Sequence, residues 1–207
     1  MTQSELAGFL QQAAHYPADA GKRRNALFAQ TATREAAVLL GMVCRDSQWQ
    51  VLLTRRNAAL PEHAGQIALA GGRKDATDTN LTHTALRETA EETGIGAEHW
   101  QTFPHFQPYY TPSGYIVSPV PALCAGNPPT FPNAAEVEEI FYLPLSVALD
   151  TRAYETRTLN YNGNRLNTPA LPYLHYDIWG LTAMILYDLA DRYRQHRQAS
   201  GACGLPF

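Results

Sequence analysis

The sequence predicts a single α+β domain, with β-strands placed before, between and after two principal helices. Residues 80–93 and 178–194 are predicted as these helices, whereas most other apolar runs are short, β-rich and bounded by turn residues. The domain is expected to span residues 31–198, preceded by an N-terminal helix and linker in residues 1–30 and followed by a C-terminal tail in residues 199–207. Of the 207 residues 45% are hydrophobic and 17% charged, which is the composition of an ordinary globular protein with a substantial core.

The first 30 residues are predicted to form a short helix and a linker. Residues 3–14 carry apolar side chains at helical spacing, which indicates an amphipathic helix. The polar stretch 15–25 predicts a linker. Its basic run, Lys22 to Arg24, is interpreted as a solvated loop, with a phosphate site as the alternative.

A hairpin, a short strand and a helix are predicted next. Ala36–Val43 and Trp49–Thr54 are apolar runs separated by a polar turn, a pattern typical of a β-hairpin. A short strand is expected around Gln66–Leu69. The helix of residues 80–93 is followed by Gly94, the residue type expected at a left-handed helix cap.

The second half of the chain is predicted to alternate strands with proline-rich loops before a last helix. The predicted elements are strands at Gln101–Tyr110, Tyr115–Leu123 and Glu138–Tyr142, a short helix at residues 144–149, a hairpin of Tyr154–Tyr161 and Asn164–Pro169, and a long helix at Ile178–Arg194. The hairpin turns through Asn162–Gly163, a pair that favours a tight turn. The last helix carries most of its apolar side chains on one face.

The charge and the apolar runs of the chain argue against a nucleic-acid or membrane partner, and its cysteines indicate free thiols. A net charge of −3 provides no basic field for a nucleic-acid backbone, so a small phosphorylated ligand is expected instead of a nucleic acid. Cys44, Cys124 and Cys203 are widely spaced and are expected to be free thiols. The N-terminus has no signal-peptide pattern, and no apolar run approaches the roughly 18 residues of a membrane span. We therefore expect a cytoplasmic protein without a membrane partner, and the sequence does not indicate its oligomeric state.

The helix at residues 80–93 carries a cluster of acidic side chains. Glu88, Glu91 and Glu92 stand at positions i, i+3 and i+4, so their carboxylates fall within about 100° of arc. Such a cluster repels itself unless a cation neutralises it, and carboxylate oxygens are the ligands that Mg²⁺ and Mn²⁺ prefer. The alternative is a solvated acidic helix face.

Neighbouring residues favour a catalytic interpretation of this cluster. Arg87 precedes Glu91 by four residues and can orient that carboxylate through a forked contact. Gly71 and Gly72 allow a close backbone approach, and a carbonyl there can serve as a further metal ligand. Leu86 and Ala90 are expected on the opposite face, packed into the core.

This segment resembles the Nudix box, the signature of a hydrolase superfamily. The matching residues are Gly72, Arg87, Glu88, Glu91, Glu92, Gly94 and Ile95. Asp78 stands where the pattern has its first glutamate, with eight residues instead of seven before Arg87, and Thr89 takes an aliphatic position. The resemblance implies the Nudix fold, a mixed β-sheet sandwiched between helices (α/β/α), and hydrolysis of a nucleoside diphosphate linked to another group.

The resemblance also implies residue roles. Glu88, Glu92 and Gly72 are expected to bind a divalent metal, and Glu91 to bind a second metal or to accept the proton of the attacking water. Arg87 is expected to orient Glu91. The general base of the superfamily often comes from a later loop, for which the candidates are Glu136, Glu138 and Glu139, with Glu136 preferred. Surface charges on a strand edge are the alternative for these three.

Upstream residues resemble the coenzyme A pyrophosphatase branch of the superfamily. The likeness lies in Leu52–Arg56, Leu60, His63, Gly65–Gln66 and Gly71–Asp75, although Asn57 and Leu69–Ala70 depart from the usual serine and Phe-Pro. It implies cleavage of coenzyme A, or its derivatives, to 4′-phosphopantetheine and adenosine 3′,5′-bisphosphate. The alternatives are hydrolysis of ADP-ribose or another nucleoside diphosphate conjugate, and a catalytically silent nucleotide-binding domain.

The second phosphate of coenzyme A requires polar residues outside the metal site. We expect Arg56, His63, Gln66 and Arg73 to bind substrate, since arginine in particular recognises phosphate through its planar fork. A surface ion pair is the alternative for an arginine at a strand end.

Overall fold

The computed structural model describes residues 1–28, 33–61, 63–161 and 163–201. Within these residues the main sheet has eight strands, whose central order is β3-β2-β1-β7-β5, with β4 beside β1, β6 beside β7 and β8 beside β2. The strands are β1 (Arg34–Arg45), β2 (Gln48–Arg56), β3 (Ile67–Ala68), β4 (Gly71–Arg73), β5 (Gln101–Thr102), β6 (Tyr109–Tyr110), β7 (Tyr115–Cys124) and β8 (Val137–Pro144). The sheet is mixed, because β1 runs parallel to β7 and antiparallel to β2 and β4.

The predicted hairpin forms the centre of this sheet. Strands β1 and β2 pair antiparallel from Arg45 and Gln48 inward, and the two residues between them, Asp46 and Ser47, have φ of 50° and 61°. Two successive residues with positive φ make the tight turn that matches the twist of a two-stranded ribbon. The hairpin was therefore predicted at its correct position.

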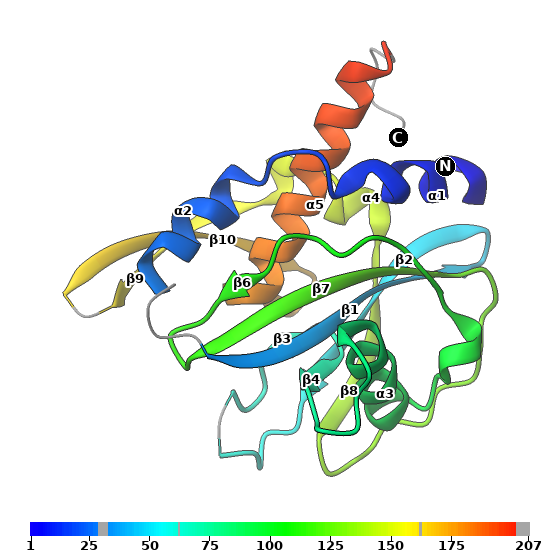
Figure 1. The fold of residues 1–207 in the computed structure, drawn as a ribbon, viewed down its shortest axis with the longest axis horizontal. Coiled ribbons are helices and arrows are strands. Elements are labelled where there is room, and N and C mark those ends of the chain that lie inside the picture. The colour runs from blue at the N-terminus through cyan, green and yellow to red at the C-terminus, as the bar shows by residue number, and fades with distance from the viewer. Residues whose placement is uncertain (29–32, 62, 162, 202–207) are drawn as a thin grey trace.

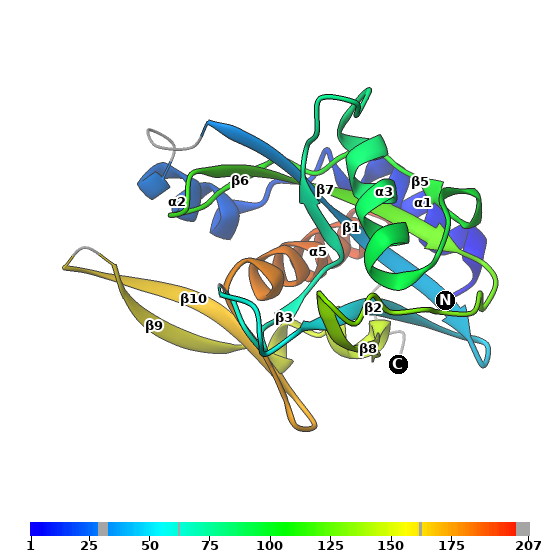
Figure 2. The ribbon, with the colours of Figure 1, turned by 90° about the horizontal axis from the view of Figure 1, so that it is seen from below.

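Helices cover both faces of the sheet (Figures 1 and 2). One face carries α3 (Leu81–Thr93), and the other carries α5 (Gly180–Ala199) with α1 (Gln3–Ala13), α2 (Asp19–Phe28) and the short α4 (Leu145–Ala148). Alternate side chains of β1 enter two separate cores: Ala37 and Leu39 pack with Ala85 of α3, whereas Leu40 and Met42 join the core that contains α1 and α5. The α+β fold with a sheet between helices is thus confirmed.

A second, smaller sheet projects from this body. Strands β9 (Glu155–Tyr161), β10 (Asn164–Tyr173) and β11 (Tyr176–Ile178) pair antiparallel, and Figure 2 shows the β9–β10 hairpin extending beyond the main sheet. The pairing of these two strands agrees with the predicted hairpin, although β10 is longer than predicted and Asn162 of the predicted turn lies outside the described residues. Strand β11 was not predicted, and it occupies the residue at which the last helix was expected to begin.

The prediction of a linker at residues 15–25 is wrong over most of its length, because helix α2 begins at Asp19. Its basic run is also not a solvated loop: Arg24 is 8% exposed and donates a hydrogen bond to the carbonyl of Tyr110. A side chain at Gly21 would clash with Asp188 of α5 and with Tyr109. Glycine is therefore needed there for the close approach of α2 to α5.

The strand predicted at residues 101–110 is wrong as a continuous element. Only its two ends, β5 and β6, pair regularly with β7. Between them the chain still follows β7, since the amides of Phe103 and Phe106 donate to Pro121 and Pro119 at 2.9 and 3.1 Å. Pro104 and Pro108 cannot donate a backbone hydrogen bond, which explains the interruption.

The last helix differs from its predicted limits. Helix α5 begins at Gly180 and continues to Ala199, five residues beyond the predicted end at Arg194. Residues 202–207 of the predicted tail lie outside the described residues. Across the described part of the chain, no helix is long and apolar enough to cross a membrane.

Candidate active site

The acidic helix α3 is fixed by its caps and its buried face. Asn80 caps the N-terminus by accepting a hydrogen bond from the amide of His83 at 2.9 Å, and Gly94 ends the helix with φ of 79°. Ala85 and Thr89 are fully buried against the sheet, whereas Leu86 and Ala90 are only half-buried. Leu86 nevertheless packs against the core that contains Ala85, as expected. The buried face is rotated by one residue toward Thr89, whose hydroxyl is satisfied by a helix carbonyl.

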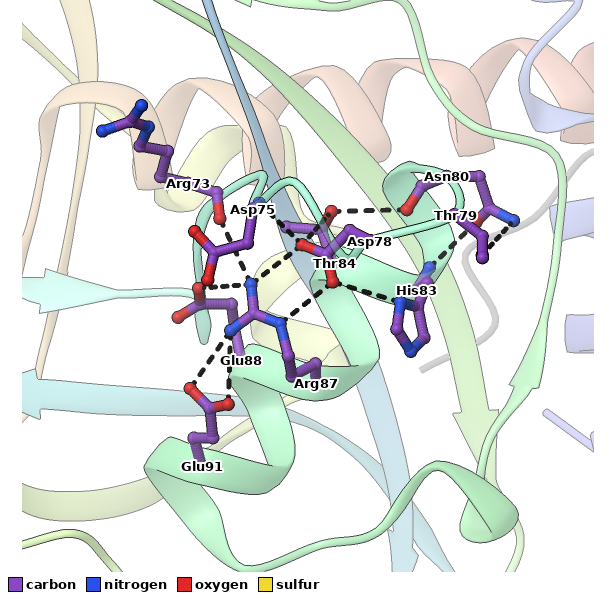
Figure 3. Close-up of polar contacts among 10 residues, drawn as sticks. All are labelled: Arg73, Asp75, Asp78, Thr79, Asn80, His83, Thr84, Arg87, Glu88 and Glu91. Carbon is purple, nitrogen blue, oxygen red and sulfur yellow. Dashed lines mark hydrogen bonds and ion pairs between the residues drawn. The ribbon is translucent and has the colours of Figure 1, made fainter.

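An ion pair between Arg87 and Asp78 is the most extensively bonded contact of the site (Figure 3). Arg87 donates from Nε and Nη2 to the two carboxylate oxygens of Asp78 at 3.0 and 2.9 Å. The Asp78 side chain is fully buried, and it also accepts hydrogen bonds from the hydroxyl of Thr84 and the amide of Asp75. The bonds from Arg87 and these neighbours hold the pKa of Asp78 well below its usual range.

Arg87 is also connected to the acidic cluster. Its Nη1 donates to both carboxylate oxygens of Glu91 at 3.3 and 3.2 Å, and its Nη2 lies 2.9 Å from a carboxylate oxygen of Glu88. Nη2 also donates to the backbone carbonyl of Arg73 at 3.3 Å. The expected contact between Arg87 and Glu91 is therefore present, as one part of a larger network anchored on Asp78.

The other two glutamates of the cluster are more deeply placed. Glu92 is 4% exposed, and burial raises its pKa to about 8, opposed by Arg56 and reinforced by Glu88 and Glu136. Burial also raises the pKa of Glu88, and the charges of Glu91 and Glu136 add to this effect against the opposing pull of Arg87. Negative charge on this cluster is therefore incompletely compensated by the protein itself.

The two glycines before α3 allow β4 to touch both the sheet and the cluster. A side chain at Gly72 would collide with the carboxylate of Glu88, and one at Gly71 would collide with the backbone of Ala37 and Val38. The amide of Gly71 hydrogen-bonds to Glu92. The double glycine thus places the β4 backbone directly against two of the carboxylates.

Glu136 reaches the cluster from a different part of the chain. The loop that carries it is tied to the end of α3, because the amides of Phe131 and Asn133 donate to the carbonyls of Thr93 and Glu92 at 2.8 and 3.1 Å. Glu136 is exposed, and its charge contributes to the raised pKa of both Glu88 and Glu92.

The other two acidic candidates face a different set of residues. Glu138 and Glu139 lie 3.9 and 3.6 Å from the guanidinium of Arg55. Glu139 also accepts a hydrogen bond from the hydroxyl of Tyr176 at 2.6 Å. Of the three candidates, Glu136 is therefore the one whose charge acts on the buried glutamates.

The chemistry of this donor set fits a hard divalent cation. As the side chains stand, no three acidic, histidine or cysteine residues in the described ranges converge tightly enough to ligate one ion. Buried Glu92 and half-buried Glu88, both with raised pKa, nevertheless lie beside a backbone that only glycine permits. A cation would compensate their charge, and carboxylate oxygens are its preferred ligands.

Three of the four predicted substrate-binding residues line one cavity. Arg56, His63 and Gln66 border a cavity of about 520 Å³ that extends from Gly71 to helix α5. His63 and Gln66 contact each other, with Nδ1 and Oε1 3.0 Å apart. Arg73 is exposed and borders a different surface depression, so it is not brought together with the other three.

Sequence reasoning left the role of Asp78 in doubt. Its position in the motif, where the Nudix pattern has a glutamate, was the signal that could have identified it as the partner of Arg87. The buried hydroxyls of Thr84 and Thr89 carried no such signal, because an isolated threonine in a helix is usually unremarkable.

A known protein family and several known proteins match most of the chain. The model of the NUDIX domain matches residues 32–159. An uncharacterized Nudix hydrolase NudL of Photorhabdus laumondii is 38% identical over 159 residues, which are 77% of this chain and 84% of that relative. The NudL of Pectobacterium atrosepticum is 39% identical over 157 residues, which are 76% of this chain and 81% of that relative.

Solved structures share the fold at low sequence identity. A MutT protein of Methanosarcina mazei aligns with a TM-score of 0.52 at 16% identity, covering 81% of this chain and 98% of that one. A C. elegans Ap4A hydrolase aligns with a TM-score of 0.51 at 15% identity, covering 81% and 99% of the two chains. The NUDIX domain of Shewanella oneidensis NrtR, solved with ADP-ribose, has a TM-score of 0.50 at 18% identity, covering 95% and 99%.

Proposed function

The chain belongs to the Nudix family and is a hydrolase of phosphoric anhydrides, and from this premise we propose that its substrate is coenzyme A or a derivative. The products are then 4′-phosphopantetheine and adenosine 3′,5′-bisphosphate. The observation that carries the proposal is the cavity beside the acidic cluster, into which the fold brings Arg56, His63 and Gln66. These residues belong to the upstream segment that resembles the coenzyme A branch.

Nudix hydrolases use divalent metals, and we propose Mg²⁺ or Mn²⁺ for this chain. Glu88, Glu92 and the backbone carbonyl of Gly72 are the groups that would hold the ion, with Glu91 as a further ligand. When bound, the cation neutralises charge on the pyrophosphate oxygens as the phosphorus–oxygen bond breaks. A side chain at position 72 would collide with the carboxylate of Glu88, which supports the Gly72 backbone and Glu88 as groups that would hold the same ion.

The remaining chemistry falls to residues that orient groups or move a proton. Arg87, anchored on Asp78, keeps the carboxylate of Glu91 in one orientation. We assign Glu136 as the general base, which takes a proton from the attacking water at a carboxylate oxygen. Its exposed carboxylate and its effect on the pKa of Glu88 and Glu92 support this assignment. Glu91 is the competing candidate for the same role.

The cysteines also support an intracellular assignment. Cys44 and Cys124 are free thiols, as expected from their spacing, and Cys203 lies outside the described residues. Unpaired thiols are the usual state in a reducing compartment, so we propose the cytoplasm as the location of the activity.

Substrate preference is tested by comparing kcat/KM for coenzyme A, dephospho-coenzyme A and ADP-ribose, each with Mg²⁺ and with Mn²⁺. We expect coenzyme A to be the best of the three, because only it offers both a pyrophosphate and a 3′-phosphate to a site with cations outside the cluster. Equal or better turnover of ADP-ribose would contradict the substrate assignment. A protein that binds these compounds without hydrolysing any of them would contradict the activity itself.

The base is tested by Glu136→Gln beside Glu91→Gln, with Glu138→Gln as the control. Removal of a general base lowers kcat by about 10²- to 10⁴-fold. We expect a loss of this size in Glu136→Gln, with loss of the acidic limb of the pH–rate profile. If kcat changes little in Glu136→Gln but falls strongly in Glu91→Gln, Glu91 is the general base instead.

A further inference from the structure

The cavity beside the acidic cluster ends on residues outside the segment that matches the NUDIX domain. At one end it is bordered by Arg56 and Gly71, which adjoin the buried carboxylates. Where it adjoins a second cavity it is bordered by Arg24 of α2 and Thr168 of β10. The matching segment covers residues 32–159, so the far wall of the cavity is supplied by the two ends of the chain.

Arg24 is a buried cation without an acidic partner. It is 8% exposed, and among the described residues it forms no ion pair with a carboxylate; its hydrogen bond goes to the neutral carbonyl of Tyr110. Asp188 of α5 accepts hydrogen bonds from the hydroxyl of Tyr109 and the amide of Gly21, and Glu155, which borders the second cavity with Arg24, forms no ion pair with it among the described residues. Burial lowers the pKa of Arg24.

Isolated buried charges are unfavourable unless something compensates them. An arginine kept in this position at a cavity wall is therefore suited to an anion that enters from the cavity.

Thr168 gives an independent indication of a polar ligand. Thr168 borders the cavity and is 3% exposed, and its buried hydroxyl has no hydrogen-bond partner. Buried hydroxyls are nearly always hydrogen-bonded in folded proteins, and an exception calls for an explanation. Arg24, Leu166 and Thr168 also border a second cavity of about 530 Å³, so these three residues separate the two cavities.

The rest of the cavity suits a flat, apolar group. Phe28, Leu159, Trp179 and Ile185 are among its lining residues. Its volume of about 520 Å³ lies within the range of small-molecule sites, which is roughly 300–1,000 Å³. An aromatic base with a phosphate nearby therefore fits the apolar lining and the polar residues Arg24 and Thr168 better than the uncharged, flexible pantetheine part of coenzyme A does.

We propose that Arg24 and Thr168 form the subsite for the 3′-phosphate of the substrate's adenosine half. This inference rests on the proposed function and deepens it, because it assigns the group that distinguishes coenzyme A from dephospho-coenzyme A. Arg24 donates to the phosphate oxygens from its guanidinium, and Thr168 donates from its hydroxyl. The pyrophosphate then lies toward Arg56 and the acidic cluster, and the base lies among the apolar residues.

The first experiment measures kcat/KM for coenzyme A and dephospho-coenzyme A in wild type, Arg24→Met and Thr168→Val. Arg23→Met is the matched control, because Arg23 is the exposed neighbour on the same helix. We expect Arg24→Met to lower kcat/KM for coenzyme A by about 10- to 100-fold, and Thr168→Val by about 3- to 10-fold. Turnover of dephospho-coenzyme A should stay within about twofold in both variants. Equal losses on the two substrates, or no loss on coenzyme A, would overturn the subsite.

Thr168→Val keeps the inference testable if Arg24→Met folds poorly. Valine has nearly the same shape, and the hydroxyl it removes has no partner in the protein. The variant should therefore unfold at the same or higher temperature than wild type while it loses discrimination between the substrates. Lower stability with unchanged discrimination would mean that the hydroxyl serves the fold and not the substrate.

The second experiment separates the subsite from the proposed activity. Isothermal titration calorimetry without divalent metal compares adenosine 3′,5′-bisphosphate with AMP as ligands of wild type and both variants. We expect wild type to bind the bisphosphate at least tenfold more tightly than AMP, and both variants to lose most of that preference. If this pattern holds in a protein that does not hydrolyse coenzyme A, the activity is wrong and the subsite stands. If coenzyme A is hydrolysed but no preference for the bisphosphate exists, the subsite is wrong and the activity stands.

Discussion

Replacing Asp78 by asparagine perturbs the ion pair that anchors Arg87 above the acidic cluster. Asparagine has nearly the shape of aspartate, so the change removes the charge and replaces one acceptor oxygen by a donor. Of the two bonds from Arg87, at 3.0 and 2.9 Å, one then meets an amide group that cannot accept it. The hydroxyl of Thr84 and the amide of Asp75, which also donate to Asp78, compete for the oxygen that remains.

The magnitude follows from the burial of the pair. The Asp78 side chain is fully buried, whereas Arg87 is 21% exposed, so water can partly compensate the arginine. Hydrogen bonds to charged groups contribute about 1.5–3 kcal/mol, and breaking a fully buried ion pair costs about 3–5 kcal/mol. We expect Asp78→Asn to lower the free energy of unfolding by about 2–4 kcal/mol. Loss of the anchor should also lower kcat by roughly 10- to 100-fold, since Arg87 no longer fixes Glu91.

The assay is urea unfolding of wild type and Asp78→Asn at several pH values. The pKa of Asp78 is depressed in the folded protein and about 3.9 in the unfolded chain. The ionised carboxylate therefore stabilises the fold fully above the unfolded pKa, and this contribution is lost as the pH falls through and below about 4. The stability difference between the two proteins should be largest near pH 7 and should shrink toward pH 3.

The control is Asp75→Asn, in the same loop. Asp75 is exposed and contributes its backbone amide to the network, so its substitution should change stability by no more than about 0.5 kcal/mol. An Asp78→Asn protein as stable as this control would refute the anchoring role. A stability difference that stays constant from pH 7 to pH 3 would refute the electrostatic explanation.

The remaining predictions concern the cluster, its glycine and a buried tyrosine. Glu92→Gln should lower kcat by orders of magnitude while leaving the metal-free fold at least as stable, because it removes an uncompensated buried carboxylate; turnover and urea unfolding check both parts. Gly72→Ala should lower kcat/KM by at least tenfold through collision with Glu88, whereas Gly126→Ala, with open space around it, should match wild type in the same assay. Tyr109→Phe should lower the free energy of unfolding in urea by about 1–2 kcal/mol, because it leaves a buried carboxylate on α5 without its hydroxyl donor; unchanged stability would contradict this.

Elements whose signals are local were predicted well. Helix α3 has a capping asparagine, a closing glycine and a regular pattern of side chains, and these act within a few residues of one another. Helix α2 has no such pattern, because its buried residues are Gly21, Arg24 and Phe28. Its position depends on partners more than 80 residues away in the chain, such as the carbonyl of Tyr110. No reading of its own residues could have supplied those partners.

The prediction of one continuous strand at residues 101–110 was wrong for a different reason. Its apolar residues do lie along β7 and enter the core, as an extended segment should. Two prolines remove the amides needed for a continuous ladder, and the chain pairs regularly only where both amide and carbonyl are available.

The sequence by itself determined the acidic helix, because the spacing of Glu88, Glu91 and Glu92 and the cap at Gly94 are properties of a few consecutive turns. Tertiary structure alone decided which residues surround that helix and how far its side chains are buried. It buried Asp78 under Arg87, raised the pKa of Glu92 by removing water, and brought Glu136 to the cluster from a distant loop. It also joined the two ends of the chain around one cavity. Desolvation and long-range packing depend on what surrounds a residue in space, and a local pattern of residue types does not contain that information.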